Sequence, residues 1–232
     1  MTASPPPTVV RFGGTERALH WGFALLYLAL VVSGLPLMFP ELRGWIRGYT
    51  PVIGFRLHLA CGAIWVLVTV TVILLGDRRA LRRTWRQLIT FGPADAAWLR
   101  HFPRWLSADG AERARLDGAV GRFNAGQKVN ALITVVTSVL LLASGVALIP
   151  VNGATLAGAL TGASSVGWWR HAHGWLTVLA LVPITGHVFL ALVFPPTRGS
   201  LPGMLSGRVD RDWAAVHHPR WRSESRDEDR AA

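Results

Sequence analysis

The run WRHAHGWLTVLALVPITGHVFLALVF, residues 169–194, has no residue of fixed charge after Arg170. A helix of about 20 apolar residues crosses the roughly 30 Å hydrocarbon core of a bilayer, so this run predicts a transmembrane helix over 169–194. Ionisable side chains are costly inside a membrane and are functional candidates by default. The histidines at 171, 173 and 187 are therefore the first candidates for a functional role.

Three further runs lack charged residues apart from histidine, and they predict spans over 17–39, 54–76 and 127–149. Pro150 and a weakly apolar stretch rich in Gly, Ala, Ser and Thr, residues 152–167, follow the third span and predict an extramembrane loop. The predicted fold class is an all-α integral membrane protein with a bundle of four transmembrane helices. The first span has no small-residue cleavage site, which argues against a secretory signal peptide.

The composition supports a membrane location, because 51% of the 232 residues are hydrophobic, 16% are charged and the mean hydropathy is +0.34. The net charge of +11 is spread between the apolar runs and accompanies no nucleic-acid motif, so nucleic acid is not a predicted partner. Cys61 is the one cysteine, which excludes a disulfide framework, a four-cysteine iron–sulfur cluster and covalently attached haem. Any cofactor must be held by histidine or carboxylate.

The basic residues predict the orientation. The N-terminal segment, the loop 77–126 with the adjoining Lys128, and the tail 198–232 hold 20 of the 24 lysines and arginines, which predicts that both termini and this loop are cytoplasmic. Residues 1–10, with three consecutive prolines, predict a disordered leader to the membrane domain 11–197. Within the loop, residues 81–91 predict an amphipathic helix on the inner leaflet.

This topology places the span histidines at two depths. His20 and His187 lie near the cytoplasmic ends of their spans, and His58 and His173 lie near the outer ends. The 14 residues between His173 and His187 correspond to about 21 Å of helical rise and bring both to one face. Two haems with paired histidine ligands, stacked across the bilayer, fit this arrangement. His171 points to another face and is predicted to be structural or interfacial.

Roles without haem stay open for these histidines. Each could be a hydrogen-bonded imidazole at the membrane interface. A zinc or copper transporter would need three or four ligands at one depth, with carboxylate or cysteine among them, whereas these histidines come in pairs. No span contains an acidic residue that could relay an ion. A haem-free membrane anchor or transporter is the alternative from a different functional class.

Several segments carry a family resemblance: Glu16-Arg17-Ala18-Leu19-His20-Trp21, Ser33-Gly34, Gly121-Arg122-Phe123-Asn124-Ala125-Gly126-Gln127-Lys128, the His173 and His187 pair, Gly203-Met204, and His217-His218-Pro219-Arg220-Trp221. From about residue 11 to 222 the chain resembles the gamma subunit (cytochrome b) of respiratory membrane-bound formate dehydrogenase, within the wider family of di-haem cytochromes b. The cytochrome b of a nickel–iron hydrogenase or of another quinone-linked dehydrogenase is the alternative within the same class.

The resemblance implies two b-type haems, an outer one held by His58 and His173 and an inner one held by His20 and His187. It implies an iron–sulfur (beta) subunit and a molybdenum- or tungsten-containing catalytic (alpha) subunit as partners, with electrons passing through the haems to menaquinone or ubiquinone. The location is then the bacterial cytoplasmic (inner) membrane. The chain has no ligands for a molybdopterin site, so no catalytic residue for formate oxidation is predicted. His217 and His218 are predicted contacts for the iron–sulfur subunit.

Two further sets of residues are candidates for ligand contacts. Arg17, Arg56 and Arg170 lie within three residues of haem-ligand candidates and could pair with haem propionates, or could serve only to orient the protein. The quinone site is predicted at the cytoplasmic start of the third span, because amide donors, a small residue and a cation follow one another there. Its residues are Asn124, Gly126, Gln127, Lys128 and, at a compatible depth, His187. Asn124 and Gln127 could instead form only a helix-capping box.

Overall fold

The computed structural model describes residues 6–151, 154–161 and 166–223. The described part is mostly helical and forms two compact units. The first, here called the membrane unit, comprises residues 18–76 and 133–183. The second, called the terminal unit, contains the described residues of 1–17, 77–132 and 184–232.

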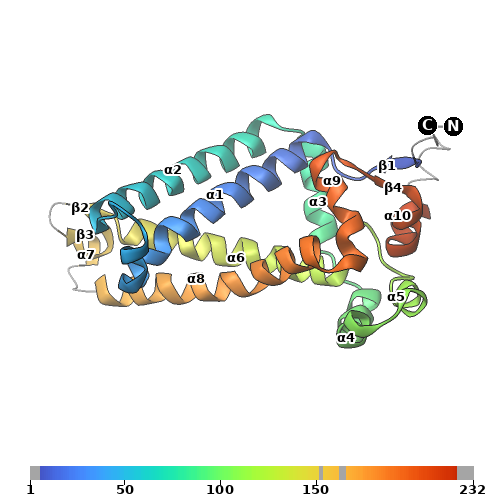
Figure 1. The fold of residues 1–232 in the computed structure, drawn as a ribbon. Helices are drawn as coiled ribbons and strands as arrows, with labels where there is room; N and C mark the ends of the chain where they lie inside the picture. The colour runs from blue at the N-terminus through green and yellow to red at the C-terminus, as the bar shows by residue number, and fades with distance from the viewer. Residues whose placement is uncertain (1–5, 152–153, 162–165, 224–232) are drawn as a thin grey trace. The chain divides into compact units, whose positions relative to one another are not determined.

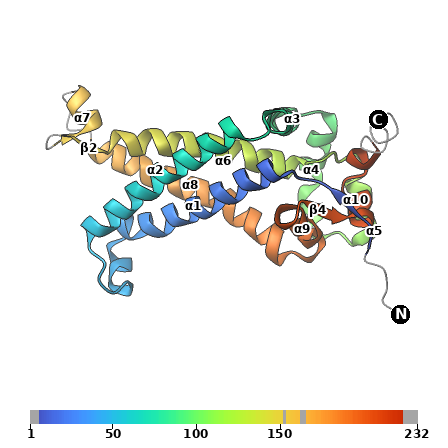
Figure 2. The same cartoon turned by 90° about the horizontal axis from the view of Figure 1, so that it is seen from above.

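Four of the described helices are long and apolar enough to cross a membrane. They are α1 (Gly14–Met38), α2 (Pro51–Leu75), α6 (Ala125–Ala147) and α8 (Val166–Val188), which continues into the π-helical turn η2 (Phe189–Val193). In Figures 1 and 2, α1 and α2 run side by side. The prediction of four apolar helices is confirmed, and the protein is a multi-pass membrane protein by this pattern.

The membrane unit has its polar and apolar residues arranged inversely to a soluble domain. Most of its buried side chains are small, with exposed fractions of 4% for Ser33, 2% for Ser144 and 0% for Ala180, and Tyr27, at 8%, is a large exception. Large apolar side chains point outward, and Leu67 and Val182 are 65% and 69% exposed. Lipid tails can cover such a surface, and small residues allow helices to approach closely.

Local capping explains several helix starts. The Thr50 hydroxyl accepts the Ile53 amide at 3.2 Å before Pro51 opens α2. Asp77 caps α3 (Arg78–Ile89) through the amides of Arg79 and Ala80. Only Gly76 and Asp77 lie between α2 and α3, so α3 begins at the end of a spanning helix.

The central loop has more structure than predicted. After α3 come α4 (Pro93–Ser107) and α5 (Gly110–Leu116), which were not predicted from the sequence. Other short helices are η1 (Pro40–Trp45), η3 (Pro195–Ser200), α9 (Leu201–Leu205) and α10 (Arg211–His217). Asp117, after α5, accepts the indole N–H groups of Trp98 and Trp105 at 3.0 and 2.9 Å, which anchors α4 on the loop.

The prediction of a disordered leader over residues 1–10 is wrong for its last part. Strand β1 (Thr8–Val10) pairs antiparallel with β4 (Arg208–Asp210), as Figures 1 and 2 show. Val9 lies opposite Val209, whose side chain is 1% exposed and belongs to a hydrophobic cluster. The apolar pair holds the strand, and this ties the N-terminal segment to the tail. Residues 1–5 and 224–232 lie outside the described residues.

The loop predicted over residues 152–167 is also only partly irregular. Strands β2 (Pro150–Val151) and β3 (Ala154–Thr155) pair, and the short helix α7 (Leu156–Thr161) follows. The Thr155 hydroxyl accepts the Gly158 amide at 3.1 Å, which favours the start of α7. Residues 152–153 and 162–165 of this loop lie outside the described residues.

Candidate functional site

His58 of α2 and His173 of α8 face each other within the membrane unit. Their ring centroids are 6.2 Å apart and their planes are nearly perpendicular, at 87°. Metal–imidazole bonds are about 2 Å long, so two imidazoles on opposite sides of one metal ion have centroids about 6 Å apart. The ring separation therefore fits a haem that these two histidines would hold, as predicted for the outer haem.

Each of these imidazoles is held by a serine followed by a glycine on a neighbouring helix. Ser33 Oγ of α1 lies 3.1 Å from His58 Nδ1, and Ser144 Oγ of α6 lies 2.8 Å from His173 Nδ1. A Cβ atom on Gly34 would lie 2.9 Å from His58 Cε1, closer than real Cβ contacts. Glycine is needed there because the ring packs against the helix backbone.

The described residues contain no group of three or more His, Cys, Asp or Glu side chains that could hold a metal ion. Structural zinc sites use four such ligands and catalytic sites three. A haem, whose porphyrin supplies the other iron ligands, needs only the paired histidines. The donor set of the described chain suits haem better than a protein-only metal site.

The second histidine pair stays a prediction. His20 belongs to the membrane unit, where its ring lies 5.4 Å from that of Trp21, and His187 belongs to the terminal unit. His187 directly precedes the last residue of α8 and the π-helical turn η2. Such turns inside helices often occur at functional sites.

The remaining candidates near these ligands have different surroundings. His171 is exposed, and its Nδ1 lies 2.7 Å from the Gly167 carbonyl, away from the His58 and His173 pair. Arg17 donates to the Leu205 carbonyl at 2.8 Å. Arg56 and Arg170 are exposed and form no ion pair with a described residue. Their predicted pairing with propionates stays a prediction.

The predicted quinone segment forms a capping box at the start of α6. Asn124 Oδ1 accepts the Gln127 amide at 2.8 Å, and Gln127 Oε1 accepts the Asn124 amide at 3.0 Å. The cap uses the two side-chain oxygens. Both side chains are only partly buried, so their NH₂ groups are the donors that a ligand could use.

Two residues of this segment have structural partners. A Cβ atom on Gly126 would lie 3.1 Å from the Trp98 ring, so the glycine makes room for the indole. Lys128 Nζ lies 2.9 Å from Asp95 Oδ2 and 2.9 Å from the Thr90 carbonyl, and its side chain is 8% exposed. Lys128 therefore fastens α6 to the α3–α4 junction and is not an exposed cation.

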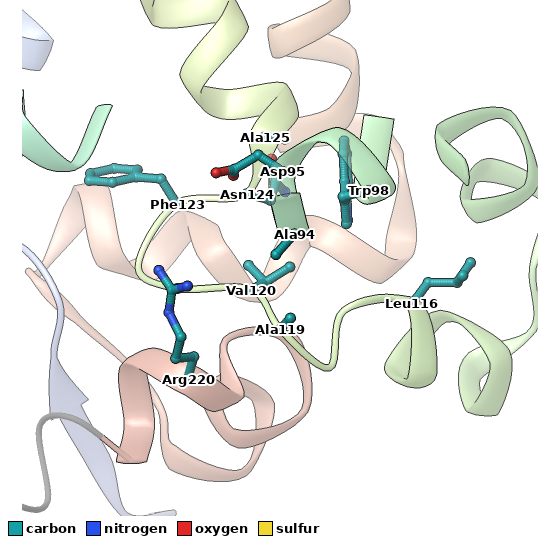
Figure 3. A pocket seen from close by; sticks show the side chains of 11 residues that line it. Ala94, Asp95, Trp98, Leu116, Ala119, Val120, Phe123, Asn124, Ala125 and Arg220 are labelled. Atoms are coloured by element: carbon teal, nitrogen blue, oxygen red, sulfur yellow. The ribbon is translucent and has the colours of Figure 1, made fainter. Parts of the chain in front are cut away.

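A small pocket lies beside Asn124. Figure 3 shows it between Asp95 and Trp98 of α4, the loop before α6, and Arg220 of the tail. Its volume is about 20 Å³, which suits roughly one water molecule and is too small for a quinone ring. It could keep a water molecule near the start of α6.

The turn η2 and its C-cap Phe194, which follow α8, pack near this segment within the terminal unit. Ala125 belongs to a buried cluster with Trp98, Trp105 and Val120, and Leu190 and Phe194 pack against that cluster. His187 lies three residues before Leu190, about one helical turn away. The start of α6 therefore shares a cluster with η2, the turn that follows His187.

A buried charge network ties α1 to the same loop. Arg122 donates to both carboxylate oxygens of Glu16, at 2.8 and 2.9 Å, and Thr84 of α3 also bonds to Glu16. Arg11 donates to the Arg122 carbonyl at 2.8 Å. Burial, with repulsion from Arg122, lowers the pKa of Arg11 to about 9, so Arg11 stays charged at pH 7. The Glu16 carboxylate thus pairs with the Arg122 guanidinium group, and Arg11 joins the network through the Arg122 carbonyl.

The prediction that His218 contacts a partner subunit is wrong, because its side chain is only 3% exposed. Its Nδ1 donates to the Gly121 carbonyl at 2.7 Å, and its ring lies among those of Trp213 and Trp221. His217 Nδ1 lies 3.0 Å from Asp117 Oδ2, and its side chain is 17% exposed. For His217 the partner contact stays a prediction.

Acidification is expected to destabilise the terminal unit through His218. Burial, Arg11 and His217 hold the pKa of His218 well below its ordinary value of 6.5, although the Gly121 carbonyl opposes this shift. Below about pH 6.5 the unfolded chain binds a proton that the folded chain does not, so stability falls by at most about 1.4 kcal/mol per pH unit. Thermal unfolding measured between about pH 7.5 and 5.5 tests this. His218→Asn keeps an amide donor but does not titrate, so it should flatten the pH dependence.

Sequence reasoning did not identify Ser144 or assign a role to Ser33. The available signal was the Ser-Gly dipeptide, which occurs at 33–34 and again at 144–145, in a span other than the one that carries the nearby histidine. It also missed Asp117 and the pairing of Glu16 with Arg122. Glu16 and Arg122 both lie in segments on which the family resemblance rests.

Comparison with known proteins agrees with this geometry. Residues 11–207 match the family described as prokaryotic cytochrome b561. The chain is 28% identical over 224 residues to the formate dehydrogenase cytochrome b556(fdo) subunit of Escherichia coli K12, covering 94% of both chains. It is 27% identical over 215 residues to the nitrate-inducible formate dehydrogenase cytochrome b556(Fdn) subunits of Escherichia coli K12 and Shigella flexneri, covering 92% of this chain and 89% of theirs. The resemblance read from the sequence is confirmed, and the chain belongs to the prokaryotic cytochrome b561 family.

Proposed function

We propose that this chain is the di-haem cytochrome b subunit of a formate dehydrogenase complex in the bacterial cytoplasmic membrane. It connects an iron–sulfur subunit on the outer side to a membrane quinone on the cytoplasmic side. The 6.2 Å separation of the His58 and His173 rings carries the proposal, and the names of the E. coli relatives supply the complex. The partners are the iron–sulfur (beta) subunit and a molybdenum- or tungsten-containing catalytic (alpha) subunit.

The protein residues in this proposal bind and orient the cofactors. His58 and His173 hold the outer haem, and His20 and His187 hold the inner one. A bound haem supplies one-electron transfer. The apolar helices around the rings exclude water, and Ser33 and Ser144 fix two of the ligand rings. The chain itself does not oxidise formate.

A visible spectrum of the purified protein tests the haem assignment. We expect sharp reduced α and Soret bands with two haems per chain, both reducible by formate when the partner subunits are present. Reduction by hydrogen and not by formate would favour the hydrogenase alternative. Absence of these bands after adequate haem supply would support a haem-free anchor or transporter.

The direction of electron movement is tested in vesicles. If electrons enter on the outer side and the quinone takes its protons from the cytoplasm, turnover moves negative charge inward without a proton channel in this chain. Reconstituted complexes supplied with formate and quinone are expected to build a membrane potential. Electroneutral turnover would contradict the proposed arrangement.

We place the quinone, menaquinone or ubiquinone, between the start of α6 and His187. The packing of Leu190 against the cluster that contains Ala125 supports this place. The NH₂ groups of Asn124 and Gln127 are the proposed donors to the quinone carbonyls, because capping occupies only their oxygens. The pocket beside Asn124 would give water access for the protons.

Replacing Asn124 by alanine is expected to lower quinone reductase activity at least tenfold, about 1.4 kcal/mol of transition-state stabilisation. Haem content and haem reduction by formate should stay normal, while reoxidation by quinone slows. Asn124→Asp is the matched control, since it keeps the capping oxygen but loses the NH₂ donor. Normal turnover in the Asp variant would show that Asn124 acts only as a helix cap.

Membrane lipid is a further proposed partner, through α3. This helix has five arginines and no acidic residue, and its Trp85 and Ile89 are 43% and 45% exposed. It begins at the end of α2, where anionic headgroups attract basic residues by about 1 kcal/mol each. Replacing Arg79, Arg82 and Arg86 together by Gln should reduce the anionic phospholipid that co-purifies with the complex. The same change at the exposed Arg100, Arg115 and Arg211 serves as the control and should retain the lipid.

A further inference from the structure

Two serines of the membrane unit make equivalent contacts on different helices. Ser33 of α1 contacts His58 of α2, and Ser144 of α6 contacts His173 of α8. Ser33 and Ser144 are 4% and 2% exposed. Because a buried hydroxyl contacts each ring, the serine and not water determines whether Nδ1 of the imidazole donates or accepts a hydrogen bond.

Each serine hydroxyl donates its proton to a backbone carbonyl of its own helix. Ser33 Oγ lies 2.7 Å from the Ala29 carbonyl, and Ser144 Oγ lies 2.8 Å from the Leu140 carbonyl. A carbonyl can only accept a hydrogen bond, so each hydroxyl donates to it. The hydroxyl oxygen is then the acceptor for the histidine, and Nδ1 of each imidazole must carry the proton.

This arrangement selects one tautomer. A neutral imidazole carries one N–H, so protonated Nδ1 leaves the lone pair on Nε2. Nε2 is the atom free to bind iron. A hydrogen bond from the other ring nitrogen orients a metal-bound histidine and raises its basicity.

We propose that Ser33 and Ser144 are positioning residues that fix the Nε2-binding tautomer of His58 and His173 and lower the reduction potential of the outer haem. The inference rests on the proposed function, because it takes these histidines as axial ligands. A more basic imidazole stabilises ferric over ferrous iron, and this lowers the potential. The glycine that follows each serine leaves room for the ring to reach the hydroxyl. A Cβ atom on Gly145 would lie 3.4 Å from His173 Cε1, and one on Gly34 would lie 2.9 Å from His58 Cε1.

The chain offers a matched control on α6. Ser138 is 5% exposed, and its hydroxyl has no hydrogen-bond partner among the described residues. Ser138→Ala removes a buried hydroxyl from the same helix as Ser144 without touching a ligand ring. Ser33→Thr and Ser144→Thr keep a hydroxyl acceptor and are the conservative variants.

Redox titration of the α-band in the purified complex tests the inference. Losing an outer-shell partner costs 10–100-fold in metal affinity. We expect Ser33→Ala and Ser144→Ala each to change the ferric-to-ferrous ratio of one haem about tenfold, which raises its potential by about 59 mV. The double variant should shift further, while Ser138→Ala and the threonine variants stay near the unsubstituted potential.

The outcomes separate the inference from the function it rests on. Loss of the outer haem in the alanine variants, with retention in the threonine variants, would also support the serine role. Equal shifts in the alanine and threonine variants, or potentials equal to that of Ser138→Ala, would overturn it. An unsubstituted complex without haem would instead refute the proposed function.

Discussion

Complexes carrying His58→Ala or His173→Ala are expected to contain one haem per chain in place of two. Each change would remove one of the two histidines that are proposed to hold the outer haem, and no covalent bond would retain the cofactor. Quinone reduction by formate should fall about 100-fold or more, which corresponds to about 2.7 kcal/mol. Pyridine haemochrome assays measure the haem, and activity is compared per assembled complex. His20→Ala and His187→Ala should remove the other haem.

His171→Ala is the control for this prediction. His171 lies two residues from His173 on α8, but its ring is exposed and interacts with the Gly167 carbonyl. Both haems should remain in this variant. If His171→Ala loses a haem and His173→Ala keeps both, the ring pair of His58 and His173 is not the ligand set.

Replacing Glu16 by glutamine is expected to lower the free energy of unfolding of the terminal unit by about 3–5 kcal/mol, because breaking a buried ion pair leaves an uncompensated charge. Glu16 and Arg122 have side chains only 7% exposed. Arg122 would lose its carboxylate partner, and the buried Arg11 beside it would face an unpaired guanidinium group. Thermal unfolding followed by tryptophan fluorescence measures the effect.

The matched change is Glu112→Gln. Glu112 pairs with Arg104 and Arg115, whose side chains are 61% and 72% exposed. Exposed pairs contribute about 0–1 kcal/mol, so this variant should unfold close to the unsubstituted protein. Similar losses in the two variants would show that burial does not govern the strength of the Glu16 pair.

The local pattern of the sequence was sufficient to predict the four apolar helices. Their charge-free runs match the thickness of the membrane, and nothing else in the chain competes for them. The pairing of His58 with His173 was also predicted from the order and direction of the spans. The structure brings their rings to 6.2 Å, whereas their place on the outer side stays a proposal.

Other features depended on contacts between distant segments. Glu16 and Arg122 are 106 residues apart, and Thr8 pairs with Asp210 across most of the chain. Charge counts assigned Arg122 only to a cytoplasmic loop, and the prolines suggested disorder for residues 1–10. Neither the charge counts nor the prolines indicate which buried partner a side chain contacts.

The same limit explains the reassigned residues. Lys128 and His218 had polar identities typical of exposed contacts, but tertiary packing buries them against Asp95 and Gly121. Ser144 belongs to a span that lacks a ligand histidine, so only the packing of α6 on α8 gives it a role. The sequence by itself determined which segments enter the membrane, because that depends on the summed hydrophobicity of consecutive residues. Tertiary structure decided which polar groups meet, because a buried group must find its hydrogen-bond partner wherever the fold supplies one.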